Sequence, residues 1–265
     1  MTQSSSTDSS LAARKVVLSF LAHPDDAEIL CAGTLIRLRQ EHGYEVHIAT
    51  ATAGDCGTID CTPEEITAIR TAEARAAAKL IGATYHCLGE RDGLVVYDKP
   101  TIRKAIELFR QLAPTLVFAH APRDYMLDHE QTSLLARGAS FIAATPNASE
   151  RPLVRGHAIP YLYYCDPIEG LDPLGTRVQP TAYVTLSSST HEQKLQMLSC
   201  HASQREWLRA HHGIDEYLEA VRRHDRSRAN ELGGNCCEFA ESFVQHRGHA
   251  YPSDNLLATL FWEKT

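Results

Sequence analysis

Short apolar runs alternate with amphipathic stretches along the first 145 residues of the chain. The run at 16–22 is nearly continuous, as is typical of a strand buried on both faces of a parallel sheet. Further strands are predicted at 45–53, 84–88 and 115–119. Apolar positions recur at helical spacing over 29–42, 63–81, 101–112 and 128–144. This alternation predicts an α/β fold with a doubly wound, Rossmann-like, mostly parallel sheet.

The pattern changes beyond Pro146. Proline and glycine are frequent up to Gly175, a fifth strand is predicted at 161–165, and the stretch 190–228 is strongly helical. No internal repeat or low-complexity linker separates these parts. We therefore expect one domain over 15–265 with a C-terminal helical elaboration, preceded by a disordered Ser/Thr-rich tail over 1–14.

Composition narrows the class of partner. The 265 residues are 43% hydrophobic and 22% charged, and 33 acidic against 26 basic residues give a net charge of -7. This balance argues against nucleic acid or an anionic membrane as partner and favours a small molecule. No apolar run reaches the roughly 20 residues needed to span a bilayer. The amino terminus does not resemble a signal peptide, and the eight scattered cysteines fit a reduced compartment, so we expect a cytoplasmic protein.

The 14 histidines raise the question of a metal site. His23-Pro24-Asp25-Asp26-Ala27-Glu28 stands where the first strand ends and its helix begins, which is where open α/β sheets place their sites. A simpler interpretation is a capping box, in which Asp25 and Glu28 only satisfy helix amides. Taken alone, the segment leaves both interpretations open.

A second polar cluster, 124–129, occupies the same place after the strand at 115–119. If that strand neighbours the first, His23, Asp26 and His129 meet in the crevice between them. Two imidazoles and one carboxylate with an open fourth position are the ligand set of a catalytic zinc, although iron, manganese and cobalt also suit it. Asp25 is then placed to take a proton from water in the open position.

These segments resemble the LmbE/PIG-L family of zinc-dependent N-deacetylases. The resemblance rests on AHPDDAEILCAGTL, IRTAEARAAAKLIGA and DYMLDHEQTS, runs from residue 15 to about 145, and continues weakly through HASQ and FAESF. It implies removal of the acetyl group from an N-acetylated amino sugar or its conjugate. It also implies that His23, Asp26 and His129 are the metal ligands and that Asp25 is the general base.

The resemblance further implies substrate contacts from Arg70 and Asp92. Each has a simpler interpretation: Arg70 as a solvated helix residue paired with Glu73, and Asp92-Gly93 as a turn. Both interpretations stay open for these two residues.

One position departs from the family motif. Where relatives carry HPDH, this chain carries Met126-Leu127-Asp128-His129, so the histidine credited with stabilising the oxyanion or protonating the amine is a methionine beside the substrate. Tyr125 is predicted to donate a hydrogen bond to the oxyanion instead. Folding could also bring in one of four other histidines: His120, His157, His246 or His249. Asp128, which supports the missing histidine in relatives, is expected to be catalytic or to remain as a helix N-cap.

Two further histidine-containing segments are predicted to lie on surface helices. His211-His212 and the HASQ segment, 201–204, have no carboxylate at ligand spacing, although Ser203-Gln204 could pack beneath the site. The nucleotide-binding and serine-hydrolase motifs GxGxxG, GxxxxGK[ST] and GxSxG are absent at the positions where they would carry function.

The sequence therefore predicts a Zn²⁺-dependent N-deacetylase acting on a small N-acetylated amino sugar or glycoconjugate. Two alternatives stay open: an amidase that cleaves a larger acyl group at the same site, and a non-catalytic sugar- or metal-binding relative. The presence of Asp25 argues against the second. The resemblance makes a homo-oligomer a candidate, and the sequence alone does not choose an oligomeric state.

Overall fold

A computed structural model of the chain describes residues 14–154, 156–212, 216–233 and 236–261. Its strands are β1 Val16–Leu21, β2 Glu45–Thr52, β3 Thr84–Glu90, β4 Leu116–Ala119, β5 Tyr161–Cys165, β6 Ala182–Leu186 and β7 Phe239–Gln245. Its helices are α1 Asp26–Leu30, α2 Ala32–His42, α3 Pro63–Leu80, α4 Lys99–Leu112, α5 Leu127–Ile142, α6 Ser188–Leu198, α7 Ala202–His212, α8 Tyr217–Glu231 and α9 Leu256–Phe261. Most of the tail predicted over 1–14 lies outside the described residues.

The strands form one mixed sheet in the order β3-β2-β1-β4-β5-β7-β6. Strands β1 to β5 pair in parallel, and β7 runs antiparallel between β5 and β6. The predicted doubly wound α/β fold is confirmed, including the pairing of β1 with β4. The predicted C-terminal helical elaboration is confirmed by α6, α7 and α8, and β6 and β7 add two strands to the sheet that the sequence did not predict.

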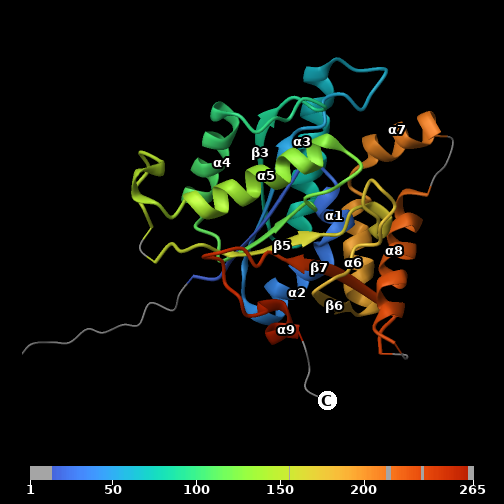
Figure 1. The fold of residues 1–265 in the computed structure, drawn as a ribbon. Helices are drawn as coiled ribbons and strands as arrows, with labels where there is room; N and C mark the ends of the chain where they lie inside the picture. Colours follow the sequence, from blue (N-terminus) through green and yellow to red (C-terminus); the bar gives the residue numbers. More distant parts are fainter. Residues whose placement is uncertain (1–13, 155, 213–215, 234–235, 262–265) are drawn as a thin grey trace, which may run out of the picture.

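Helices cover both faces of the sheet (Figure 1). Helices α4 and α5 lie side by side on one face, over a core that includes Phe20 and Phe109. On the other face α1, α2, α3 and α6 pack over a core that includes Leu21 and Leu35. Successive residues of β1 therefore point into different cores, and this double burial is what the continuous apolar run indicated.

The first helical stretch is divided into two helices, where the sequence predicted one. The chain breaks at Cys31, whose φ of -148° and ψ of 5° are not helical, so α1 is a single short turn and α2 begins anew. The new helix start is held by the Glu241 carboxylate of β7, which accepts the backbone N–H groups of Gly33 at 2.9 Å and Thr34 at 2.7 Å. A Cβ at Gly33 would lie 2.5 Å from Leu186 Cδ1, so a larger residue here would force the buried Leu186 side chain to move.

A buried lysine joins the C-terminal elements to Glu241, which holds the start of α2. Lys194 of α6 is fully buried and donates to Asp225 of α8 at 2.7 Å and to Glu241 at 2.8 Å. Burial opposes its charge, but the two carboxylates outweigh burial and hold the pKa of Lys194 above its usual value. One ammonium thus links α6, α8 and β7 and, through Glu241, the start of α2.

Replacing Lys194 by Met is expected to destabilise the fold strongly. The substitution keeps the apolar stem but leaves Asp225 and Glu241 buried without their shared cation, which costs about 3–5 kcal/mol. Urea unfolding monitored by circular dichroism measures the change, and Lys99→Met, on the exposed first turn of α4, is the matched control. A loss below about 1 kcal/mol would show that the two carboxylates do not depend on Lys194.

No helix among the described residues is both long enough and apolar enough to cross a membrane. The expected cytoplasmic location and the single-domain boundary at residue 15 remain predictions.

Candidate metal centre

Two polar segments meet at the carboxyl ends of β1 and β4. His23 follows β1 by two residues and His120 follows β4 directly, and these strands are hydrogen-bonded neighbours. His129 comes from the first turn of α5. One ligand atom from each of His23, Asp26 and His129 lies within 4.8 Å of the others, and all three residues are buried. The fold thus brings together the three residues that the sequence singled out for a metal.

The turn between β1 and α1 is conformationally strained. Asp25 has a φ of 102°, in the left-handed region that a non-glycine residue rarely adopts, and such strain concentrates at functional sites. Its side chain makes no capping hydrogen bond. Glu28 lies 3.5 Å from His201 Nε2. The capping-box interpretation of these two acids is therefore wrong.

One ring nitrogen of each candidate histidine ligand lies close to the Asp26 carboxylate. His129 Nε2 lies 3.7 Å from Asp26 Oδ1, and His23 Nδ1 lies 3.4 Å from Asp26 Oδ2. Burial opposes ionisation of Asp26, but neighbouring charge on His129 and His120 keeps its pKa below the usual range. An ionised carboxylate and two imidazole nitrogens suit Zn²⁺ and similar divalent ions.

Each imidazole is fixed through its other nitrogen by a carboxylate. His129 Nδ1 lies 3.0 Å from Asp124 Oδ1. His23 Nε2 lies 3.1 Å from Asp92 Oδ1 and 3.3 Å from Asp128 Oδ2. A carboxylate behind a histidine is the usual means of orienting it toward a metal. The residues present therefore fit a metal ion held by His23, Asp26 and His129.

Asp128 is not the N-cap of α5, which corrects one of the two expectations for it. The N-cap position is Met126, which makes no side-chain capping bond. The Asp128 carboxylate instead accepts the backbone N–H groups of Gly93 at 2.6 Å and Val95 at 3.1 Å. It therefore fastens the loop after β3 to the site, and the Asp92-Gly93 turn is brought against His23.

Asp25 lies beside the triad with its own hydrogen-bond partner. The Tyr217 hydroxyl of α8 donates to Asp25 Oδ2 at 2.6 Å, and Arg70 Nη2 lies 3.8 Å from the same oxygen. Burial is the largest influence and raises the pKa of Asp25 above its ordinary value, against the opposing charge of Arg70. All described contacts of this carboxylate use Oδ2, which leaves Oδ1 to accept a proton.

Arg70 is buried, so its interpretation as a solvated helix residue paired with Glu73 is wrong. Its guanidinium donates to the carbonyl oxygens of Pro24 at 2.9 Å and Gly54 at 3.1 Å, joining the loops after β1 and β2. Gly54 has a φ of 70°, and a Cβ there would collide with the guanidinium. Glu73 instead accepts hydrogen bonds from the Ser203 backbone and hydroxyl.

Tyr125 and Met126 stand at the exposed side of the centre. Tyr125 is 60% exposed, and its ring meets the His129 ring edge-on at 5.4 Å between centroids. Burial and the nearby carboxylates raise its pKa, so its hydroxyl keeps its proton. Met126 is 37% exposed. Both lie where a bound molecule could reach them.

His120 is the histidine that folding brings to the centre. It is fully buried, stacks on the His129 ring at 3.8 Å, and its Nε2 lies 2.9 Å from Ala22 N and 3.0 Å from Asp26 Oδ2. Among the described residues, His157, His246 and His249 enter none of the clusters that could hold a metal. His120 therefore packs against two of the three candidate ligands.

The C-terminal half supplies groups that the sequence did not reveal. His201 is buried against Glu28, so its expected surface position with no carboxylate partner is wrong. Ser203 packs on α3 through Glu73. The side chains of His211 and His212 lie outside the described residues. No local sequence pattern indicated that Tyr217 belongs to the site, because a lone tyrosine at the start of a helix forms no motif.

Comparisons with known proteins place this geometry in context. The model of the PIG-L family, described as GlcNAc-PI de-N-acetylase, matches residues 18–140. A 4-oxalmesaconate hydratase of Pseudomonas putida is 26% identical over 199 residues, which are 72% of this chain and 74% of the relative.

Two solved structures show the same fold over almost the whole chain. The 4-carboxy-2-hydroxymuconate hydratase GalB of Pseudomonas putida KT2440 superposes with a TM-score of 0.72 at 23% identity, covering 91% of this chain and 99% of its own. The N,N'-diacetylchitobiose deacetylase of Pyrococcus horikoshii gives a TM-score of 0.73 at 24% identity, covering 92% and 89%.

Proposed function

Since residues 18–140 belong to the PIG-L family, we propose that this protein is a metal-dependent hydrolase that removes the acetyl group from an N-acetylated amino sugar or its conjugate. The observation that carries the proposal is the buried cluster of His23, Asp26 and His129 with Asp25 beside it. The family and its deacetylase members support the acetamide as the bond cleaved.

A divalent ion, which we propose to be zinc, would supply a Lewis acid that polarises the substrate carbonyl and acidifies water. His23, Asp26 and His129 would hold it. Asp124 behind His129, and Asp92 and Asp128 behind His23, keep the two imidazoles oriented. This rigid support keeps the ligand atoms in place before substrate arrives.

In this account Asp25 moves the proton. Its Oδ1 accepts a proton from the attacking water as the water oxygen bonds to the acyl carbon. The same carboxyl then returns the proton to the nitrogen as the C–N bond breaks, releasing acetate and a free amine. The raised pKa of Asp25 suits both transfers, and its use twice compensates for the histidine replaced by Met126.

Substrate contacts are assigned to the exposed side of the centre. The Tyr125 hydroxyl would donate to the developing oxyanion, and Met126 would pack against the acyl or sugar part. Asp92, with its side chain partly accessible beside His23, would accept a sugar hydroxyl. Arg70 is too deeply buried for a first contact and would act by holding Asp25 and the two loops.

Tyr217→Phe is expected to lower kcat by about 10- to 100-fold, because a hydrogen bond to a charged group is worth about 1.5–3 kcal/mol. Steady-state kinetics with metal analysis measures the effect, and the metal content should not change. Tyr183→Phe, which removes a hydroxyl bound to Glu231 away from the site, is the control. Equal kcat for the two variants would rule out a role for Tyr217 in holding Asp25.

Hydration of an unsaturated acid is a second candidate, favoured by the 4-oxalmesaconate hydratase relative. Water addition to a C=C bond also needs an activated water and a base; the proton goes to the neighbouring carbon, and no amine has to be protonated. The methionine at 126 is compatible with that chemistry.

A substrate panel separates the candidates. The proposal predicts acetate release from N-acetylglucosamine conjugates or N,N'-diacetylchitobiose, with mass spectrometry identifying the acyl group released. Loss of a larger acyl group would favour the amidase alternative. Decay of the ultraviolet absorbance of a conjugated dicarboxylate, without acetate release from any sugar, would favour the hydratase. Binding without product would favour a non-catalytic relative.

A further inference from the structure

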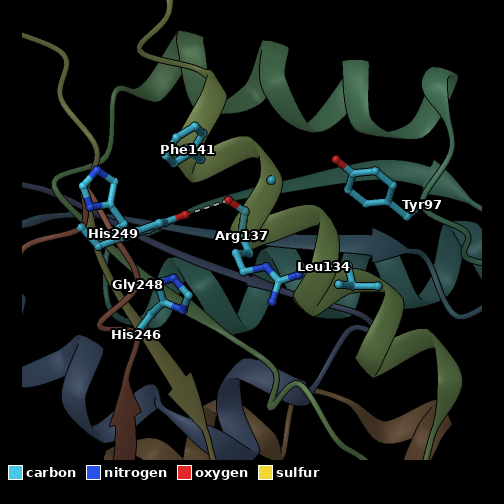
Figure 2. Close-up of a pocket in the computed structure, with 9 residues that line it drawn as sticks. Tyr97, Leu134, Arg137, Phe141, His246, Gly248 and His249 are labelled. Carbon is cyan, nitrogen blue, oxygen red and sulfur yellow. Dashed lines mark hydrogen bonds between the residues drawn. The ribbon is translucent and has the colours of Figure 1, made fainter.

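A cavity of about 500 Å³ lies over the outer side of α5 (Figure 2). It is lined by Tyr97, Leu134, Arg137, Gly138, Phe141, His246, Gly248, His249 and Tyr251. None of these residues belongs to the cluster of His23, Asp26 and His129. The two sites share α5, which carries His129 on its first turn and Arg137 two turns further along, and the loop after β3, which carries Asp92 and Tyr97.

Arg137 brings an unneutralised positive charge to this cavity. Among the described ion pairs no carboxylate lies within 4.0 Å of its guanidinium, whereas Arg177 and Arg228 pair with Glu231 and Asp166. Figure 2 shows the Arg137 side chain extending between Leu134 and the His246 ring. An exposed guanidinium without a carboxylate, facing a hollow, is suited to bind an anionic group from outside.

The residues that line the cavity beside Arg137 include neutral polar groups and no aspartate or glutamate. The Tyr164 hydroxyl lies 3.0 Å from His246 Nδ1, which leaves His246 Nε2 for another contact. Burial, followed by the Arg137 charge, lowers the pKa of His246, so the ring is neutral at pH 7. A neutral imidazole beside a guanidinium can donate one hydrogen bond to an anion without adding a second buried charge.

The walls of the cavity are aromatic. Phe141 and Tyr251 have ring centroids 6.3 Å apart, and Tyr251 meets the His246 ring edge-on at 4.3 Å. Tyr97 closes the opposite side, with its hydroxyl 2.9 Å from where a Cβ on Gly138 would be. Tyr97 and Phe141 are 49% and 47% exposed. Glycine at 138 therefore lets the Tyr97 ring pack closely against α5 at the edge of the cavity.

We propose that this cavity binds a small organic anion, with its carboxylate or phosphate on Arg137 and a flat apolar body against Tyr97 and Phe141. Apolar walls with one or two placed polar groups are the usual composition of small-molecule sites. The volume of about 500 Å³ lies within the range of such sites. The inference does not depend on the proposed deacetylation, because no residue of the metal cluster takes part.

Isothermal titration calorimetry of the full chain tests the proposal, with benzoate, phenyl phosphate and inorganic phosphate as probes. We expect one binding site per chain for a probe whose anionic group pairs with Arg137. Arg137→Gln should weaken binding at least tenfold, whereas Arg75→Gln, on the exposed face of α3, should not change it. Tyr97→Ala should weaken the two aryl probes about 3- to 10-fold and leave inorganic phosphate unchanged. His129→Ala should retain binding, which separates this cavity from the metal centre.

The result that overturns the proposal is specific. Either no heat from both aryl probes at millimolar concentration, or equal affinity in the wild type and Arg137→Gln, would show that the cavity does not bind organic anions through Arg137. Loss of binding in His129→Ala with retention in Arg137→Gln would place the probe at the metal centre instead. Circular dichroism of each variant checks that it is folded.

Discussion

Replacing Asp25 by Asn is expected to lower kcat by about 10²–10⁴-fold while leaving the metal content unchanged. Asparagine has the same shape and still accepts a hydrogen bond from Tyr217, but it cannot take a proton from water or return one to nitrogen. Because burial already disfavours the charged form of Asp25, the neutral replacement should not destabilise the fold. The loss should therefore appear in kcat and not in stability.

Single-turnover kinetics and metal analysis on the same preparation measure this effect. Asp98→Asn is the matched control, because Asp98 is an exposed N-cap of α4 away from the centre and its variant retains a capping side chain. If Asp25→Asn keeps more than about a tenth of the wild-type kcat, Asp25 is not the base.

Replacing His129 by Ala is expected to remove both metal and activity. The change deletes one of three ligands and leaves Asp26 and Asp124 without their shared imidazole. Lewis-acid catalysis supplies several kcal/mol, and each 1.4 kcal/mol is about tenfold in rate, so kcat/KM should fall by about 10³-fold or more.

A graded series separates ligand loss from general damage. Asp124→Asn keeps the His129 ligand but weakens its support, so metal affinity should fall only about 10- to 100-fold and excess metal should restore activity. His129→Ala should not recover at the same metal concentration. Recovery of both variants to the wild-type rate would mean that His129 is not a ligand.

The sequence predicted the parallel half of the fold well, because each element there carries a local signal. The apolar run at β1 marks a strand buried on both faces, and the alternation with helices fixes the parallel sheet. Strands β6 and β7 were missed. Glu241 and Ser242 interrupt the apolar pattern of β7, and they are buried because they bind Thr34 and Asp166, which are distant in sequence. Such partners leave no trace in a local pattern.

The candidate site likewise contains some residues that the sequence predicted and others that it did not. His23, Asp25 and Asp26 lie within one turn, and the pairing of β1 with β4 brings His129 beside them. Residue spacing and sheet topology were therefore enough to predict that these four residues lie together. Tyr217 reaches Asp25 across 192 positions, and His201 reaches Glu28 through the packing of the C-terminal helices. Neither contact follows from a periodicity, because both depend on how separate helices pack.

The contacts of Asp25 bear on the replacement of the family histidine by Met126. Tyr217 and Arg70 both approach Oδ2 of Asp25, so a single carboxylate oxygen is left to exchange protons. An enzyme that uses Asp25 for both proton transfers has less need of a second acid. In this proposal, the use of Asp25 for both proton transfers distinguishes the chain from relatives with an intact HPDH motif.

The measurement that tests the central claim most directly is acetate release from N-acetylglucosamine conjugates by the full chain, before and after removal of its metal. The account predicts about one divalent ion per chain, loss of acetate release on chelation, and recovery when Zn²⁺ is restored. Undiminished acetate release by a preparation shown to be metal-free would contradict it.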